Sequence, residues 1–206
     1  MKSRQSGFTL VEIAIVLVII GLLLGGVLKG QELIFNSKVK ATFNLSREMS
    51  AAINSYIDRY GQLPGDDTQA ATRFPAANPL PVNGNGDGNI PFNGGCTNGT
   101  NTFEQCEALY ELRLAGFISG TGTTSIHTPF GGWAELGRGQ DFYPNFGALP
   151  AIGFYPAGIS FKAASAIDTS FDDANPATGS WRCRTLATYN MSTPDNTVPD
   201  WCAMQM

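Results

Sequence analysis

A single carboxylate, Glu12, lies within a nearly continuous apolar run at residues 8–28. The run has 21 residues, and about 20 apolar residues span ~30 Å of hydrocarbon as a helix. A charged side chain in a membrane helix costs roughly 2.5–3.5 kcal/mol on insertion scales, so an ionisable residue there indicates a function. The chemistry available to this carboxylate is pairing with a cation.

The cation that we expect is a new amino terminus. Cleavage after Gly7 would free an α-amino group on Phe8, and a pKa of about 8 keeps such an amine mostly cationic at neutral pH. In a continuous helix this amine does not easily reach Glu12 of its own chain, but it can reach Glu12 of a neighbouring copy. At ~4 Å and an effective dielectric constant of ~20, the attraction is about 4 kcal/mol before desolvation is subtracted. We therefore expect that only docking in register satisfies the charge.

Two simpler interpretations of the run are a secretory signal peptide and a plain membrane anchor. A signal peptide has an apolar core of about 7–15 residues and then a small-residue cleavage site. This run is longer, and Lys29, Gln31 and Glu32 follow it directly. Lys2 and Arg4 precede it, so we expect the N-terminus to stay cytoplasmic and the rest of the chain to be exported.

Residues 6–12, Ser-Gly-Phe-Thr-Leu-Val-Glu, resemble the prepilin cleavage and methylation motif of type IV pilins and type II secretion pseudopilins. The resemblance implies that a prepilin peptidase cuts between Gly7 and Phe8 and methylates Phe8, and that Phe8 and Glu12 guide assembly. It implies a single-pass inner-membrane protein that contacts lipid and an assembly platform. The protein then joins other pilins in a helical filament at the cell surface or in the periplasm. Many family members have a proline where this sequence has Lys29.

The fold class that the resemblance implies is α+β: a long N-terminal helix packed on a small, loop-rich head with an antiparallel β-sheet. Apolar residues recur at helical spacing up to Tyr60, and Gly61 and Pro64 end the pattern. One helix from residue 8 to 60 is expected, and a break near Gly25-Gly26 or Gly30 is the alternative. The expected organisation is a leader at 1–7, a membrane and filament-core helix at 8–28, an amphipathic helix at 29–60 and a head at 61–206.

Within the head, local patterns predict several short elements. We expect short helices at residues 103–114 and 163–171, and short strands at 152–154, 159–161 and 180–188.

The four cysteines all lie beyond the apolar run: Cys96, Cys106, Cys183 and Cys202. An even number in an exported segment fits two disulfides in an oxidising compartment. Three connectivities are possible, and we favour Cys96–Cys106 and Cys183–Cys202 because each closes a short loop. Each bond is expected to add roughly 2–4 kcal/mol to the free energy of unfolding. The single histidine, His127, and the absence of a Cys-x-x-Cys pair argue against zinc.

An Asn/Gly/Asp-rich segment at residues 83–90 has oxygen-bearing side chains at alternating positions, as in the first half of a calcium loop. The candidate ligands are Asn83, Asn85 and Asp87, with Asp66 from the preceding loop. No glutamate stands at the twelfth position, so Asp66, Asp67 or Glu104 would have to complete a site in three dimensions. The simpler interpretation is a turn-rich loop without a ligand. Calcium is the one possible cofactor; otherwise we expect none.

The remaining chemistry argues against an enzyme. His127 is the only histidine, no Gly-x-Ser-x-Gly motif occurs, and the adjacent Asp172 and Asp173 are typical of a turn. Residues 61–206 carry a net charge of −7, so no nucleic-acid partner is expected. We predict a pilin, most simply a minor pilin because the head is large. A secretion pseudopilin, or a tip adhesin whose tryptophans bind sugars, are the alternatives.

Overall fold

The computed structural model of the chain describes most of the sequence in two compact units. The units are Met1–Lys38 and Val39–Met206. The described residues are 9–96, 103–143, 146–154, 159–184 and 201–206.

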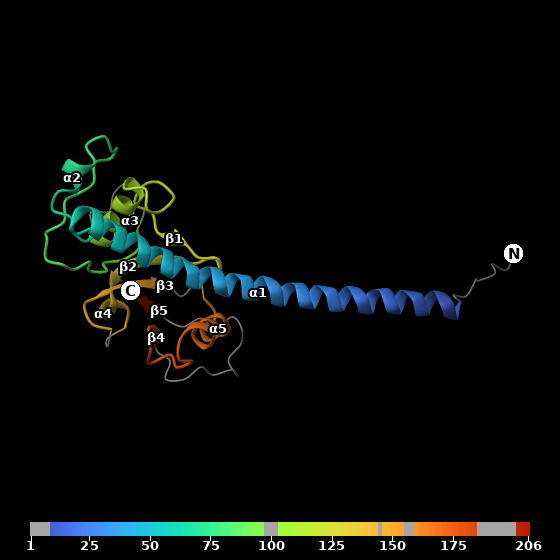
Figure 1. The fold of residues 1–206 in the computed structure, drawn as a ribbon. Helices are drawn as coiled ribbons and strands as arrows, with labels where there is room; N and C mark the ends of the chain where they lie inside the picture. Colours follow the sequence, from blue (N-terminus) through green and yellow to red (C-terminus); the bar gives the residue numbers. More distant parts are fainter. Residues whose placement is uncertain (1–8, 97–102, 144–145, 155–158, 185–200) are drawn as a thin grey trace. The chain divides into compact units, whose positions relative to one another are not determined.

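Helix α1 covers Leu10–Tyr60 as one continuous element (Figure 1). It passes through Gly25, Gly26 and Gly30 without an interruption of its helical assignment. A Cβ atom at any of these glycines would meet nothing within 4 Å, so no close contact within the described chain requires them. The expectation of a single helix is confirmed, and the alternative of two broken helices is not supported.

The part of α1 that belongs to the second unit buries one face. Its buried residues recur at spacings of three and four, which places them on one side of an α-helix. They are Val39, Thr42, Ser46, Met49, Ala52, Ile53 and Tyr56. Gly61 ends the helix in the left-handed region at φ +71°, and its N–H donates to Ile57 O at 2.7 Å.

In the described residues, five short strands form one antiparallel sheet in the order β1-β2-β3-β5-β4 (Figure 1). Their bounds are β1 Ile126–His127, β2 Trp133–Arg138, β3 Pro150–Phe154, β4 Trp181–Arg184 and β5 Trp201–Gln205. Helix α3, Glu104–Leu114, packs against β2. The long helix and the antiparallel sheet confirm the α+β, pilin-like layout.

A close approach between a ring and a glycine organises one part of the sheet. Helix α4, Gly139–Phe142, contacts β2, β3 and β5. The ring of Phe142 lies where a Cβ atom at Gly153 would be only 2.3 Å from it, so Gly153 permits this packing. Phe142 belongs to a buried cluster with Phe146, Ala151 and Ala203.

Two short helices complete the described fold. They are α2, Ala70–Arg73, and α5, Phe161–Phe171. The expected strand at 159–161 is wrong, because Ser160 caps α5 instead: its side chain accepts a hydrogen bond from Ala163 N at 3.3 Å. Phe171 at the end of α5 stacks on Phe43 of α1, with ring centroids 4.0 Å apart.

Candidate functional site

The first turn of α1 is closed by reciprocal contacts between Thr9 and Glu12. The N–H and the hydroxyl of Thr9 each donate to Glu12 Oε2 at 2.8 Å. The N–H of Glu12 donates to Thr9 Oγ1 at 3.3 Å. This arrangement is a capping box, and the spacing Thr9-x-x-Glu12 is its sequence signal. The carboxylate of Glu12 thus has hydrogen-bond partners within its own chain, and its pairing with the amine of a neighbouring copy stays a prediction.

The apolar residues that follow Glu12 are exposed in the described chain. None of the residues in the most apolar 18-residue window of α1 is buried, and α1 is long and apolar enough to cross a membrane. Leu10 is 86% exposed and Leu22 is 74% exposed. Such a surface is costly in water, since burying one large aliphatic side chain is worth about 1.5–3 kcal/mol. Gly7 and Phe8, where cleavage is expected, lie outside the described residues.

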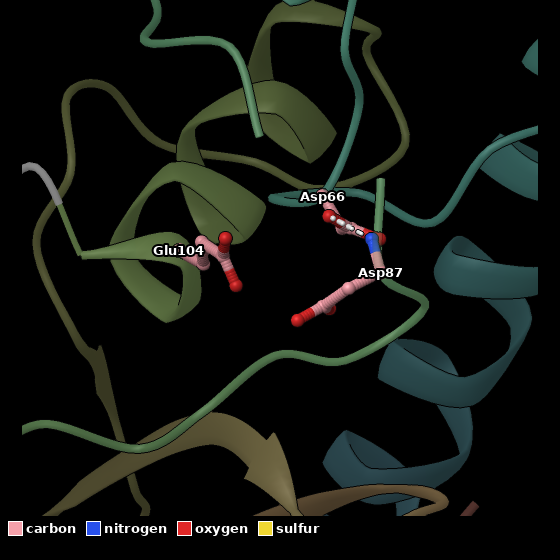
Figure 2. A group of neighbouring side chains, drawn as sticks. All are labelled: Asp66, Asp87 and Glu104. Atoms are coloured by element: carbon pink, nitrogen blue, oxygen red, sulfur yellow. Dashed lines mark hydrogen bonds between the residues drawn. The ribbon is translucent and has the colours of Figure 1, made fainter. Parts of the chain in front are cut away.

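Three carboxylates meet beside the Asn/Gly/Asp-rich loop. Asp66, Asp87 and Glu104 each contribute an oxygen, and these oxygens lie within 4.8 Å of one another. Figure 2 shows the carboxylates of Asp87 and Glu104 directed toward the same space, with Asp66 above it. Glu104 comes from the first turn of α3. The structure thus brings together two of the four expected ligands and adds Glu104, which was one of the residues considered for completing the site.

Backbone N–H groups hold one member of this group in place. Asp66 is 4% exposed. It accepts hydrogen bonds from the N–H groups of Gly86 at 2.5 Å, Asp87 at 3.3 Å and Gly88 at 2.6 Å. These bonds wrap the loop around the carboxylate of Asp66 and so place Asp87 beside it.

Glu104 lies in an unfavourable electrostatic position. Its pKa is raised, first by burial and then by the negative charges of Asp66 and Asp87. Its Oε1 atom accepts a hydrogen bond from Asn85 Nδ2 at 2.8 Å, whereas its buried Oε2 atom has no hydrogen-bond partner within the part of the chain that the structure describes. A cation would relieve both the repulsion and the unpaired oxygen.

Two residues of the expected calcium set have other roles in the structure. The Oδ1 atom of Asn83 accepts a hydrogen bond from Ala71 N at 2.9 Å, so this oxygen stabilises α2. The Oδ1 atom of Asn85 accepts from Asp87 N at 2.8 Å, which makes a local turn. The Oδ1 atoms of both amides are thus engaged elsewhere, and Asn85 contacts the carboxylate group only through its Nδ2 atom.

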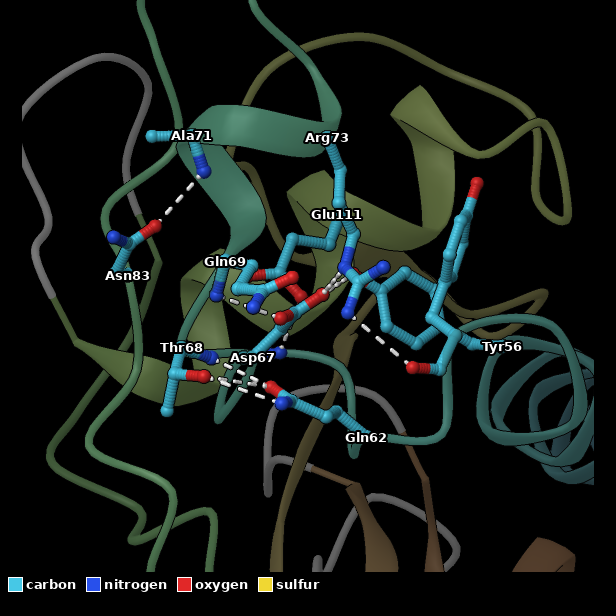
Figure 3. A network of polar contacts seen from close by, with 11 residues as sticks. Tyr56, Gln62, Asp67, Thr68, Gln69, Ala71, Arg73, Asn83 and Glu111 are labelled. Carbon is cyan, nitrogen blue, oxygen red and sulfur yellow. Dashed lines mark hydrogen bonds and ion pairs between the residues drawn. The ribbon is translucent and has the colours of Figure 1, made fainter.

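A second polar network, absent from the sequence-based expectations, surrounds Asp67 (Figure 3). Asp67 is fully buried. Its Oδ2 atom accepts from Tyr56 Oη at 2.9 Å and from Arg73 Nε at 2.6 Å. Its Oδ1 atom accepts from Gln69 N at 2.8 Å. The network joins the end of α1 to α2, and no local sequence pattern signals it because its members are dispersed.

Another acidic group lies at the C-terminal end of α5. Oxygens of Asp168, Asp172 and Asp173 lie within 4.8 Å of one another. Asp168 Oδ1 accepts from Ala174 N at 2.9 Å, and Asp172 Oδ2 accepts from Trp181 N at 2.8 Å. These bonds fold the chain between α5 and β4, which agrees with the interpretation of Asp172 and Asp173 as turn residues.

The disulfides are Cys96–Cys106 and Cys183–Cys202, the two pairs that short loops favour. Cys183 and Cys202 are direct partners in the β4–β5 register, and Cys106 lies on α3. Each bond therefore joins a loop or strand to a packed element of the head.

The tryptophans differ in their availability for stacking on a ligand. Trp181 is 1% exposed, and Trp201 packs against the Phe142 cluster. Trp133 is 46% exposed and lies against His127, with ring centroids 4.9 Å apart. Of the three, Trp133 alone offers a substantial exposed aromatic face.

Comparison with known proteins identifies the N-terminal segment. Residues 2–28 match the model of a family described as the prokaryotic N-terminal methylation motif. Over 71 residues the chain is 35% identical to the fimbrial protein EcpC of Eikenella corrodens. The aligned segment covers 34% of this chain and 46% of that protein. The chain thus aligns with less than half of the length of this curated relative. No solved structure matches the chain.

The long apolar helix and the antiparallel sheet give the chain a pilin-like α+β layout. More particularly, residues 2–28 carry the prokaryotic N-terminal methylation motif, and a relative that matches is a fimbrial protein.

Proposed function

We propose that this protein is a minor pilin, a structural subunit of a type IV pilus-like helical filament. The observation that carries the proposal is an uncovered apolar helix surface that begins with a capped carboxylate, Glu12. Lipid covers this surface before assembly, and the helices of other pilins cover it in the filament core.

The proposed sequence of events starts at the inner membrane. Lys2 and Arg4 hold the N-terminus on the cytoplasmic side. A prepilin peptidase then cuts between Gly7 and Phe8 and methylates the new amine. At the assembly platform this cation pairs with Glu12 of a neighbouring subunit. Because Phe8 then immediately precedes the Thr9 cap, the amine and the Glu12 carboxylate belong to the same end of each helix.

The test is to determine the N-terminus of the protein in two fractions, sheared surface filaments and membranes. We expect methylated chains beginning at Phe8 in the sheared fraction, in smaller amounts than a major pilin. A Gly7→Ala variant should keep its leader and stay in the membrane. Filaments that work normally with residues 1–7 retained would refute the proposal.

The same fractionation separates the alternatives. A secretion pseudopilin would be processed at Phe8 but absent from the sheared fraction. A tip adhesin would be present there in trace amounts and would lose ligand binding with Trp133→Ala, since Trp133 has the exposed aromatic face.

We also propose that calcium binds the group formed by Asp66, Asp87 and Glu104. Calcium takes oxygen ligands, and extracellular modules bind it with a Kd of about 0.1–1 mM. The observation that supports the site is the convergence of three carboxylate oxygens from two loops and α3. Bound calcium would hold residues 65–88 against α3.

For this site we predict that calcium raises the stability of the folded chain. With free calcium at about ten times Kd, ligand linkage adds about 1.4 kcal/mol to the free energy of unfolding. Thermal unfolding of the full-length chain in detergent, in calcium or in chelator, measures the effect. Asp87→Asn should abolish the difference, whereas Asp58→Asn, an exposed change on α1, should keep it. Identical melting temperatures in calcium and in chelator would contradict the proposal.

A further inference from the structure

Glu111 on α3 is a buried carboxyl group that the proposed function does not use. Its side chain is 0% exposed. The Oε2 atom accepts a hydrogen bond from Gly65 N at 2.8 Å. The Oε1 atom is also buried, and it has no hydrogen-bond partner among the described residues. One half of the carboxyl group is thus satisfied by the backbone, and the other half has no donor.

The charged and titratable groups around Glu111 disfavour a negative charge on it. Tyr56 of α1 presents its hydroxyl, and Asp67 and Glu107 contribute negative charge from the loop and from α3. The nearby cation, Arg73 of α2, forms an ion pair with Asp67 at 2.6 Å. Burial is the main cause that raises the pKa of Glu111 to about 8, and the negative charges of Asp67 and Glu107 add to it against the opposing hydrogen bond from Gly65 N.

A proton on Glu111 would complete the network that Figure 3 shows. The Tyr56 hydroxyl donates its own hydrogen to Asp67 Oδ2 at 2.9 Å, so its oxygen is available as an acceptor. A protonated Oε1 atom supplies the missing donor. An ionised Oε1 atom would instead remain an unpaired buried charge, which is costly.

We propose that the folded head keeps Glu111 protonated and that loss of this proton in alkaline solution loosens the junction of α1, α3 and the loop around Asp67. The stability of this junction then depends on pH. The junction is stable while Glu111 donates toward Tyr56, and it is weakened once Glu111 ionises. This inference is independent of the filament and calcium proposals.

The sign of the pH dependence follows from linkage. The pKa of Glu111 is about 8 in the folded state and near its ordinary value of 4.5 in the unfolded chain, so the folded state binds one more proton between these values. The stabilisation is complete below about pH 4.5 and is lost as the pH rises through about 8. Within this window the unfolding equilibrium constant should increase by up to about tenfold per pH unit from Glu111 alone.

The experiment compares wild type and Glu111→Gln as full-length chains in detergent, unfolded by urea between about pH 5 and 9. The amide keeps an acceptor for Gly65 N and supplies a permanent donor toward Tyr56. We expect Glu111→Gln to reduce the slope of the unfolding free energy against pH by the equivalent of close to one proton. We also expect it to be more stable than wild type at pH 9. Glu48→Gln, an exposed change on α1, should leave the slope unchanged.

Buried Glu107 and Glu135 also have raised pKa values, so only the difference between variant and wild type reports on Glu111. If Glu111→Gln does not fold, a carbon-13 NMR titration of the wild-type Glu111 carboxyl group decides instead. A midpoint near pH 8 supports the proposal. An unchanged slope in Glu111→Gln, or a midpoint below about pH 6, overturns it.

Discussion

Replacing Glu12 by glutamine is expected to remove most surface filaments while export and leader removal continue. The amide keeps an oxygen that can accept from the N–H and hydroxyl of Thr9, which donate to Glu12 Oε2 in the wild type. It lacks the charge that pairs with the amine of the next subunit. A hydrogen bond between charged groups contributes about 1.5–3 kcal/mol net, so each docking step should weaken roughly tenfold to a hundredfold.

The comparison with Thr9→Val separates the two roles of Glu12. Valine removes the hydroxyl from the capping box but leaves the Glu12 charge for intermolecular pairing. Loss of a cap costs about 0.5–2 kcal/mol of helix stability, and membrane or filament packing of α1 outweighs this cost. Immunoblots of sheared filaments should therefore be near normal for Thr9→Val and strongly reduced for Glu12→Gln. Normal filament levels with Glu12→Gln would remove charge pairing from the proposed mechanism.

The second large effect is expected in the head, where Asp67→Ala should destabilise the fold by about 3–5 kcal/mol. The change leaves the partly buried guanidinium of Arg73 without its carboxylate and the Tyr56 hydroxyl without its acceptor. It also frees the N–H of Gln69. Domains of this size have about 5–15 kcal/mol of stability, so this loss is a large part of the total.

Urea unfolding of the full-length chain in detergent measures this prediction. Asp58→Ala is the control, because Asp58 is an exposed aspartate on α1 and such surface changes stay within about 0.5 kcal/mol. Asp67→Asn should fall between the two, since the amide retains an acceptor but not the charge. A loss below about 1 kcal/mol for Asp67→Ala would mean that the Arg73 pair does not stabilise the folded head.

Local sequence patterns were sufficient for the helices α1, α3 and α5, but not for α2, α4 or most of the sheet. The helices α1, α3 and α5 follow apolar spacing along one segment, and this signal is contained within each element. The strands β2 and β5 were not expected, because each is short and is stabilised by pairing with strands far away in the sequence. Residues 159–161 show the converse error, in which a short apolar pattern was assigned to a strand although Ser160 begins a helix.

The candidate sites also differ in how far the sequence identifies their residues. Glu12 is unusual in any apolar run, so its role as a functional carboxylate could be inferred without coordinates. Glu104 could be considered but not chosen, because its approach to Asp66 depends on how α3 packs against the loop. Nothing in the sequence distinguishes Asp67, which joins the buried network, from Asp66, which faces the other carboxylates.

The sequence alone determined the membrane-length helix, the placement of one carboxylate near its start and the cysteines able to form two local disulfides. These features depend on residue type and on spacing within one segment, for which hydrophobicity and chain geometry are enough. Only the tertiary structure decided which acidic side chains converge and that Arg73 forms its ion pair with Asp67 and not with Glu111. Those outcomes depend on burial and on distances between segments, which no local pattern of residues specifies.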